Sequence, residues 1–146
     1  MALAQHRQTV SVPLKVLFDT IMDFNSYSQF AGGVKKSQIL SKDASEITVR
    51  MEVELMKRID YTITVKSEFS GEAARISWTL KEGDFFQQND GLWELTSTGP
   101  DSTAVLYQLD LDFSVSVPSF ILKGLIKTSL PKAVQDFSEE AKRRMK

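Results

Sequence analysis

The sequence contains no cysteine and only one histidine, His6, among 146 residues. Without a thiol the chain cannot form a disulfide, a cysteine-ligated zinc site, an iron–sulfur cluster or a thiol nucleophile. One histidine leaves only carboxylates as further metal ligands, and it does not by itself make a catalytic triad with serine. Phosphate-binding motifs of the G-x-G-x-x-G or P-loop type are also missing. We therefore expect no metal and no cofactor, and the sequence identifies no catalytic residue.

The charges nearly balance, because 18 Lys and Arg stand against 19 Asp and Glu, which gives a net charge of −1. A nucleic-acid-binding domain usually carries a clear basic excess, so neither nucleic acid nor the ribosome is an expected partner. The basic residues near the end, at positions 142–146, are most simply a solvated helix terminus.

Hydrophobic residues do not form a stretch that could span a membrane. The longest candidate, residues 115–130, is interrupted by Pro118, Lys123, Gly124 and Lys127. The first residues lack the basic and apolar regions of a secretory signal peptide, so we expect a cytoplasmic protein with at most a peripheral membrane contact. Without repeats or linkers, the sequence predicts one domain over residues 1–146, and it does not indicate the oligomeric state.

Helical spacing of apolar residues appears early in the chain. The spacing over residues 14–22 predicts an amphipathic helix that starts at Ser11 or Val12, with Pro13 in its first turn. A short strand precedes this helix. A second short helical turn carries Tyr27 and Phe30, and the glycines at positions 32–33 should end it.

Alternation with period two dominates the middle of the chain. It runs through residues 47–55, 59–66, 75–81 and 105–115, which is typical of half-buried antiparallel strands. Turn signals at residues 42–45, 70–72, 89–91 and 98–101 separate these segments. The pattern predicts about seven strands in a curled antiparallel sheet with one apolar face.

Helical spacing returns after residue 117 and continues nearly to the end of the chain. Pro131 lies inside this stretch, so we expect a kink or break near residues 128–130, with Ser129 as a candidate N-cap for the second segment. Because the apolar face of the sheet must be covered, this long helix should lie in its concavity. The expected fold class is α+β.

Four sequence segments, in this order, resemble those of one known family. They are residues 16–30, which end in Tyr27 and Phe30, residues 80–95, with Gly83 before an aromatic pair and then Trp93, residues 109–113, and residues 133–142. The family is the polyketide cyclase/dehydrase and coenzyme Q-binding branch of the START-like (SRPBCC, Bet v 1-like) superfamily. The resemblance covers essentially the whole chain, although residues 28 and 31–33 depart from the family pattern, which has proline there. It implies a helix-grip fold with an apolar tunnel between the sheet and the C-terminal helix, in which members bind lipids, quinones, sterols or polyketides.

The inward-facing residues of the strands and the last helix are the candidates for lining such a tunnel. Each is bulky and apolar, and any one of them is more often plain core. Four are aromatic residues that also carry a hydrogen-bonding atom. The candidates are Met51, Val53, Tyr61, Ile63, Trp78, Trp93, Tyr107, Leu109, Leu111, Phe113, Leu122 and Ile126.

Aromatic residues outside these strands are candidates for the tunnel entrance: Tyr27, Phe30, Phe86 and Phe120. Phe85 and Phe86 are adjacent, so one of them must point away from the core if the chain is extended there. One interpretation is a strand start with an exposed Phe, and the other is a loop at the tunnel mouth that meets ligand or membrane.

The leading functional hypothesis is a non-enzymatic carrier or sensor of a hydrophobic small molecule. A cyclase or dehydratase acting in the same tunnel is the second, and it would need a buried acid or base. Asp110 and Asp112 share the polar face of their strand and are poor candidates for that role. Arg50 and Arg75 likewise fall on the outer face by parity. The third hypothesis is a ribosome-associated interaction module.

Overall fold

The structure is a computed structural model that describes residues 2–54 and 57–145, without the side chains of Ala2, Leu122, Leu125 and Ile126. In this part of the chain, one antiparallel sheet of seven strands has the order β1-β7-β6-β5-β4-β3-β2. The strands are β1 (Ala2–Val10), β2 (Val34–Lys42), β3 (Ile47–Glu54), β4 (Arg58–Phe69), β5 (Ala73–Glu82), β6 (Phe86–Gly99) and β7 (Ser102–Phe113).

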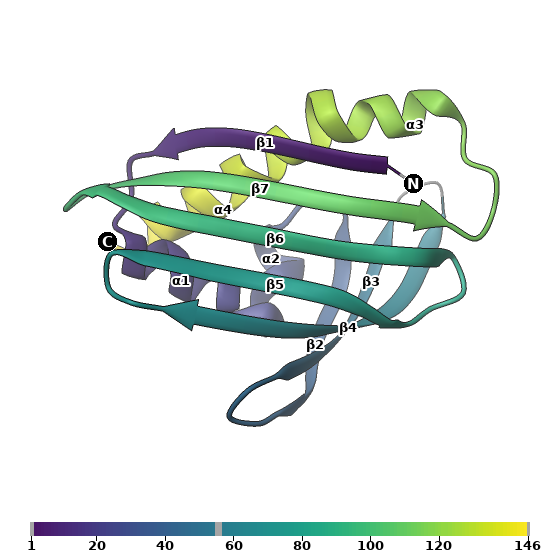
Figure 1. The fold of residues 1–146 in the computed structure, drawn as a ribbon, viewed down its shortest axis with the longest axis horizontal. Helices are drawn as coiled ribbons and strands as arrows, with labels where there is room; N and C mark the ends of the chain where they lie inside the picture. Colours follow the sequence, from purple (N-terminus) through teal and green to yellow (C-terminus); the bar gives the residue numbers. More distant parts are fainter. Residues whose placement is uncertain (1, 55–56, 146) are drawn as a thin grey trace.

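The helices lie on one side of this sheet, in two groups (Figure 1). The first group connects β1 to β2 and comprises α1 (Leu14–Met22), the 3₁₀-helix η1 (Phe24–Ser26) and α2 (Tyr27–Phe30). The second group follows β7 and comprises α3 (Ser119–Gly124), the π-helix η2 (Leu125–Ser129) and α4 (Leu130–Arg144). Helix α4 runs across the concave face of the sheet, so the expected α+β helix-grip fold is confirmed.

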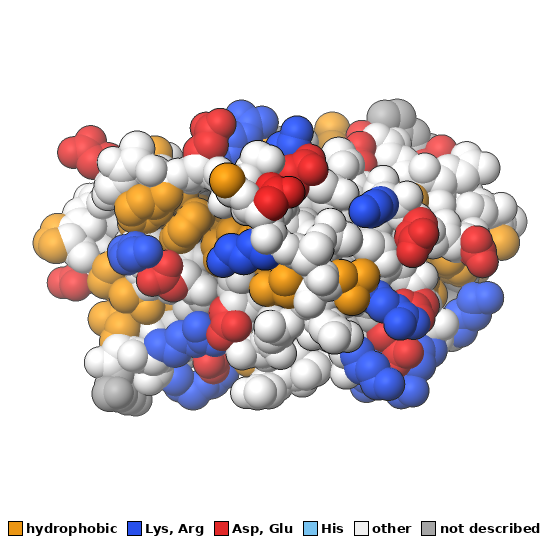
Figure 2. All heavy atoms as spheres, turned by 90° about the horizontal axis from the view of Figure 1, so that it is seen from below, with side chains coloured by type: hydrophobic (Ala, Val, Ile, Leu, Met, Phe, Trp, Pro, Cys, Tyr) orange, Lys and Arg blue, Asp and Glu red, His pale blue; other side chains and the backbone are white. Residues whose placement is uncertain are grey.

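Along each strand, side chains alternate between the buried face and the outer face of the sheet, as the period of two predicts. In β3, Ile47, Val49 and Met51 are buried, whereas the intervening Arg50 is exposed and pairs with Asp60 of the neighbouring strand on the outer face. Arg75 is also exposed. Charges of both signs intermingle around separate apolar groups on the face shown in Figure 2, so a continuous basic surface is not seen there.

Helix α1 begins at Leu14, later than the predicted start at Ser11 or Val12, and Pro13 precedes the helix instead of lying in its first turn. Pro13 is the N-cap, and Leu14, Leu17 and Ile21 are buried against the core. Proline has no amide hydrogen to leave unsatisfied at this position, and its fixed φ suits a helix start.

The predicted turn at residues 89–91 is wrong, because these residues lie inside β6. The connection from β5 to β6 is instead made by residues 83–85, where Gly83 has a φ of 153°. Since Phe85 lies in the turn and Phe86 in the strand, the two side chains need not alternate across a sheet. Both are buried, with 8% and 6% exposed, which corrects the expectation that one points away from the core.

The C-terminal helix is irregular near Pro131, as predicted, but it is not broken. The wider π-helical turn of η2 ends at Ser129, immediately before α4, where Pro131 occupies the first turn. Ser129 lies at the predicted N-cap position of α4, but it has helical angles (φ −70°, ψ −41°) and its side chain makes no capping hydrogen bond. A widened turn accommodates proline by changing the backbone hydrogen-bond pattern without ending the helix.

Candidate functional site

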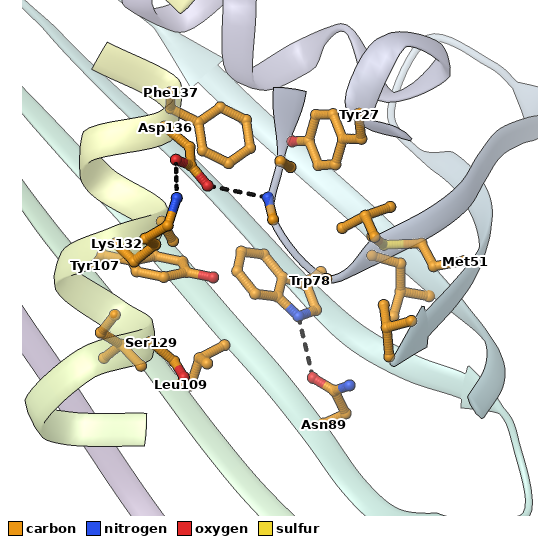
Figure 3. Close-up of a pocket in the computed structure, with 18 of the residues that line it drawn as sticks. Tyr27, Met51, Trp78, Asn89, Tyr107, Leu109, Ser129, Lys132, Asp136 and Phe137 are labelled. Atoms are coloured by element: carbon orange, nitrogen blue, oxygen red, sulfur yellow. Dashed lines mark hydrogen bonds and ion pairs between the residues drawn. The ribbon is translucent and has the colours of Figure 1, made fainter. Parts of the chain in front are cut away.

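A cavity of about 560 Å³ lies between the concave face of the sheet and α4. Its walls come from β2 to β7, from α1 and α2, and from the last helix, and the loop between α2 and β2 forms one end (Figure 3). The cavity exists because α4 rests on the sheet through Val134 and Phe137, while the middle of the sheet curves away from the helix.

Most of the predicted lining residues border this cavity. They are Met51, Val53, Tyr61, Ile63, Trp78, Trp93, Tyr107, Leu109 and Leu111, together with the predicted entrance residues Tyr27 and Phe86. Phe113 does not border it, because its ring packs against Phe85 and Phe86, with centroids 5.5 and 5.4 Å away. The predicted Leu122 and Ile126 have side chains outside the described part of the structure.

The other two predicted entrance residues lie away from the cavity. Phe30 packs edge-to-face on Tyr27 and Phe137, with centroid distances of 5.8 and 5.1 Å. Phe120 is on α3, where 69% of it is exposed, and it does not border the cavity. The sequence interpretation missed Asn89, which it assigned to a turn, and Lys132 and Asp136, which it left among the polar residues of the last helix.

Aromatic rings form much of the wall. Trp93 and Tyr107 stack with centroids 4.1 Å apart, and Phe137 of α4 meets Trp93 edge-on at 5.2 Å. On the other side, Tyr61 and Phe86 are edge-to-face at 5.3 Å. These contacts hold each ring in one orientation, so the cavity has a preformed shape.

A neutral polar cluster lies inside the cavity, away from its charged end (Figure 3). Asn89, only 5% exposed, accepts a hydrogen bond from Trp78 Nε1 at 3.4 Å, and its amide hydrogen-bonds the Tyr61 phenol. Tyr61 in turn donates to Met51 Sδ at 3.8 Å. Asn89 points inward because the parity of β6 places it on the same face as Gly91 and Trp93.

The phenols around the cavity stay protonated at neutral pH. Burial raises the pKa of Tyr61 to about 12, although the hydrogen bond from Asn89 acts against that rise. Burial, and secondarily the proximity of Tyr61, also raises the pKa of Tyr107, and burial raises that of Tyr27 well above its ordinary value. These groups are therefore hydrogen-bond donors and not anions under physiological conditions.

The charged end of the cavity connects α4 to the loop between α2 and β2. Asp136 accepts hydrogen bonds from Lys132 Nζ at 2.6 Å and from the backbone N–H of Gly32 at 2.9 Å. The hydrogen bond to Asp136, and secondarily the negative charge of that carboxylate, raise the pKa of Lys132. The Lys132 side chain is 60% exposed, so this end lies next to solvent.

Within residues 2–54 and 57–145, His, Asp and Glu side chains do not assemble into a group of three that could hold a metal ion. In the same part of the chain, the helices are too short or too polar to cross a membrane.

The family model described as polyketide cyclase / dehydrase and lipid transport matches residues 10–138. Among solved structures, a START superfamily protein from Mycobacterium smegmatis is 20% identical, with a TM-score of 0.84 and 99% of both chains covered. The Zhui aromatase/cyclase from Streptomyces sp. R1128 is 15% identical, with a TM-score of 0.83 over 99% of this chain and 95% of that one.

One sequence relative is the ribosome association toxin RatA of Escherichia coli K12. It is 24% identical over 144 residues, which are 97% of this chain and 89% of RatA. The two solved structures have low sequence identity to this chain, so their similarity establishes the fold alone. The family model matches most of the chain, which establishes membership of that family.

Proposed function

Because the chain belongs to the polyketide cyclase / dehydrase and lipid transport family, we propose that it binds and carries a hydrophobic small molecule in the cavity beneath α4. The single observation that carries this proposal is a preformed cavity of about 560 Å³ with mostly apolar and aromatic walls. That volume lies within the roughly 300–1,000 Å³ typical of small-molecule sites.

Burial of apolar ligand surface would supply most of the affinity. Each Å² removed from water contributes about 25 cal/mol before ordering costs are subtracted. The rings of Trp93, Tyr107 and Phe137 are already held by one another, so ligand binding need not order them.

Binding is favoured over catalysis by the state of the polar groups in the cavity. A cyclase or dehydratase needs an acid or base that can exchange a proton with its substrate. Asp136, a carboxylate at the cavity wall, is occupied by Lys132 and the Gly32 amide. The tyrosines have raised pKa values, so at neutral pH they are weak acids and the phenolate that could act as a base is not populated.

Native mass spectrometry of the freshly purified protein, followed by solvent extraction, tests this proposal. We expect a bound adduct of one chemical class, or, from an empty preparation, a rise in melting temperature when lipids or quinones are added. The variant Leu109→Trp places a larger side chain in the cavity and should abolish both signals. Leu40→Trp is the matched control, because Leu40 is 51% exposed on edge strand β2.

Binding that persists in a folded Leu109→Trp protein would place the ligand elsewhere. Failure of every lipid and quinone to bind or to stabilise the wild-type protein would contradict the proposal.

A further inference from the structure

Among the described residues, the cavity reaches the surface between two parts of the chain. One part is the loop after α2 together with the end of β3, and the other is the junction of η2 and α4. Every exposed residue that lines the cavity lies in these two parts, whereas the other described lining residues are buried or half-buried. The exposed lining residues are Gly32, Gly33, Glu54, Thr128, Ser129 and Lys132. We call the space between the two parts the slot, and a ligand that enters the cavity should pass through it.

One hydrogen bond spans the slot in the part of the chain that the structure describes. The backbone N–H of Gly32 donates to Asp136 Oδ2 at 2.9 Å, so it joins the loop to α4 (Figure 3). Lys132 Nζ holds the other oxygen of the same carboxylate at 2.6 Å. Because the acceptor is charged, this hydrogen bond is stronger than one between neutral groups.

The residues on either side of Gly32 have anchors of their own. Ala31 N–H donates to the Tyr27 carbonyl at 2.8 Å, which ties it to the last turn of α2. The Gly33 carbonyl accepts the Glu54 N–H at 2.8 Å, which ties it to the end of β3. The bond from Gly32 to α4 can therefore break while both neighbours stay in place.

The broken state leaves neither partner buried without a hydrogen bond. Gly32 is exposed, so water can satisfy its amide, and Lys132 still pairs with Asp136. Gly32 and Gly33 are consecutive glycines, which gives the loop the backbone freedom to turn the amide away from the helix. Opening therefore costs about one hydrogen bond and no desolvated group.

Aromatic packing confines this opening to the slot. Phe137, the residue after Asp136, contacts the rings of Tyr27 and Phe30 edge-on, with centroids 5.0 and 5.1 Å away. These contacts hold α2 against α4 next to the slot. The loop can move away from Asp136 without separating the two helices.

We infer that the Gly32–Asp136 hydrogen bond is a latch that must open for a ligand to pass through the slot. The inference rests on the proposed binding function and concerns the rates of entry and exit, not the class of ligand. The latch consists of protein groups alone, and it closes the slot whether or not the cavity is filled. Removing it should speed entry and exit together and change their ratio, the dissociation constant, much less.

The probe for this test is N-phenyl-1-naphthylamine, an uncharged dye that fluoresces in apolar surroundings. Both tryptophans of the chain, Trp78 and Trp93, line the cavity, so energy transfer from tryptophan to the dye reports dye bound there. Stopped-flow mixing measures association, and displacement by excess unlabelled lipid measures dissociation. In Asp136→Ala we expect both rate constants to rise about tenfold, because opening no longer breaks a hydrogen bond to a charged group.

Two further variants separate the latch from other effects. Asp136→Asn keeps a side-chain oxygen that can accept the Gly32 N–H, so its rate constants should be close to those of the wild type. Thr103→Val removes a buried hydrogen bond to the Val12 carbonyl, 2.8 Å long, at a residue that does not line the cavity. It should lower stability without changing the rate constants. Urea unfolding shows that each variant is folded and how much stability it has lost.

Unchanged rate constants in a folded Asp136→Ala protein would overturn the inference and leave the proposed function intact, because the dye would still bind. Equal acceleration in Asp136→Asn would also overturn it, since the ion pair with Lys132 would then set the rates. Acceleration in Thr103→Val would point to general loosening of the fold and would overturn it as well. If the wild-type protein did not bind the dye, the proposed function would be contradicted for uncharged apolar ligands, and the inference would fall with it.

Discussion

The missing side chain at position 91 makes room for the indole ring of Trp78. A Cβ built on Gly91 would lie 1.9 Å from Cζ2 and 2.2 Å from Cε2 of Trp78, far closer than van der Waals contact. Trp78 therefore lies flat on the backbone of β6, where its Nε1 reaches Asn89. The glycine is required for packing inside a strand and not for a turn.

We expect Gly91→Ala to destabilise the protein by about 1–3 kcal/mol, because Trp78 must leave its place or the two strands must separate. Urea unfolding measures the loss, and the tryptophan emission should shift as the ring moves. Gly124→Ala is the control, since a Cβ there meets no atom within 4 Å and alanine favours a helix. If the Gly91→Ala protein were as stable as the wild type, Trp78 could pack in another position at no cost in stability.

Tyr61 links stability to alkaline pH. Its pKa in the folded protein is about 12, against an ordinary value of 10. Below pH 10 both states are protonated and the shift has no effect. Above pH 10 the unfolded state loses the proton first, so the free energy of unfolding falls as the pH rises toward 12.

Tyr61→Phe should remove this dependence. Between pH 10 and 12, the wild type should lose about 1.4 kcal/mol per pH unit more than the variant. Unfolding curves at fixed pH values measure the difference, and below pH 9 the two proteins should show parallel pH dependence. Parallel curves throughout would mean that Tyr61 ionises in the folded state as easily as in the unfolded state.

The alternation of apolar and polar residues was enough to identify most inward-facing side chains, including Tyr61 and Trp93. It could not identify Asn89, because a polar residue beside Asp and Gly is the usual signal of a turn. Pairing of this segment with β7, where Asn89 faces Leu111 and Gly91 faces Leu109, overrides that local preference. Asp136 was missed because its partners, apart from Lys132, are far away in the sequence.

The contact between α4 and the loop after α2 joins two elements that are distant in the chain. Asp136 on the helix accepts the Gly32 N–H, and the two residues are 104 positions apart. A Cβ at Gly32 would lie 3.2 Å from Asp136 Oδ2, so the close approach of loop and helix favours glycine. This contact fixes the loop at the end of the cavity.

Asp136→Ala should therefore destabilise the protein by about 1–3 kcal/mol and leave the Gly32 amide without its acceptor. Urea unfolding measures the first effect, and faster hydrogen exchange at Gly32 measures the second. Glu139→Ala is the control on the same helix, because Glu139 is exposed and accepts a hydrogen bond from its neighbour Gln135 at 3.1 Å. Unchanged exchange at Gly32 would show that the loop is held by other contacts.

The order and types of the elements followed from apolar spacing, but two details did not. Pro131 predicts an irregular helix without saying which irregularity, and the structure has a π-helical turn and not a break. The aromatic pair at positions 85–86 is buried because the tight turn after Gly83 redirects the chain. That turn places both rings among residues that are distant in the sequence, including Ile59 and Leu130.

The sheet depends on the C-terminal helix to cover its apolar face. Leu130, Val134, Phe137 and Ala141 of α4 are at least 95% buried. An open sheet without this cover would expose the cavity walls to water, which the hydrophobic effect opposes.

A chain that ends at Pro118 keeps all seven strands but should show no cooperative unfolding transition on heating. A chain that ends at Arg144 is the control, and it should unfold like the full protein because Met145 is half exposed. Circular dichroism and calorimetry distinguish the two results. Cooperative melting of the shorter chain would show that the sheet is stable without α4.

The pairing of β1 with β7 has a consequence for synthesis of the protein. Each strand from β2 to β6 can pair with the next as it emerges from the ribosome, because these neighbours are adjacent in the chain. The first strand has no such neighbour, since Ala2 faces Leu111 and Val10 faces Thr103. Strand β1, which is synthesised first, can therefore pair only after β7 has been synthesised. The cavity forms only after α4, which follows β7, has also left the ribosome.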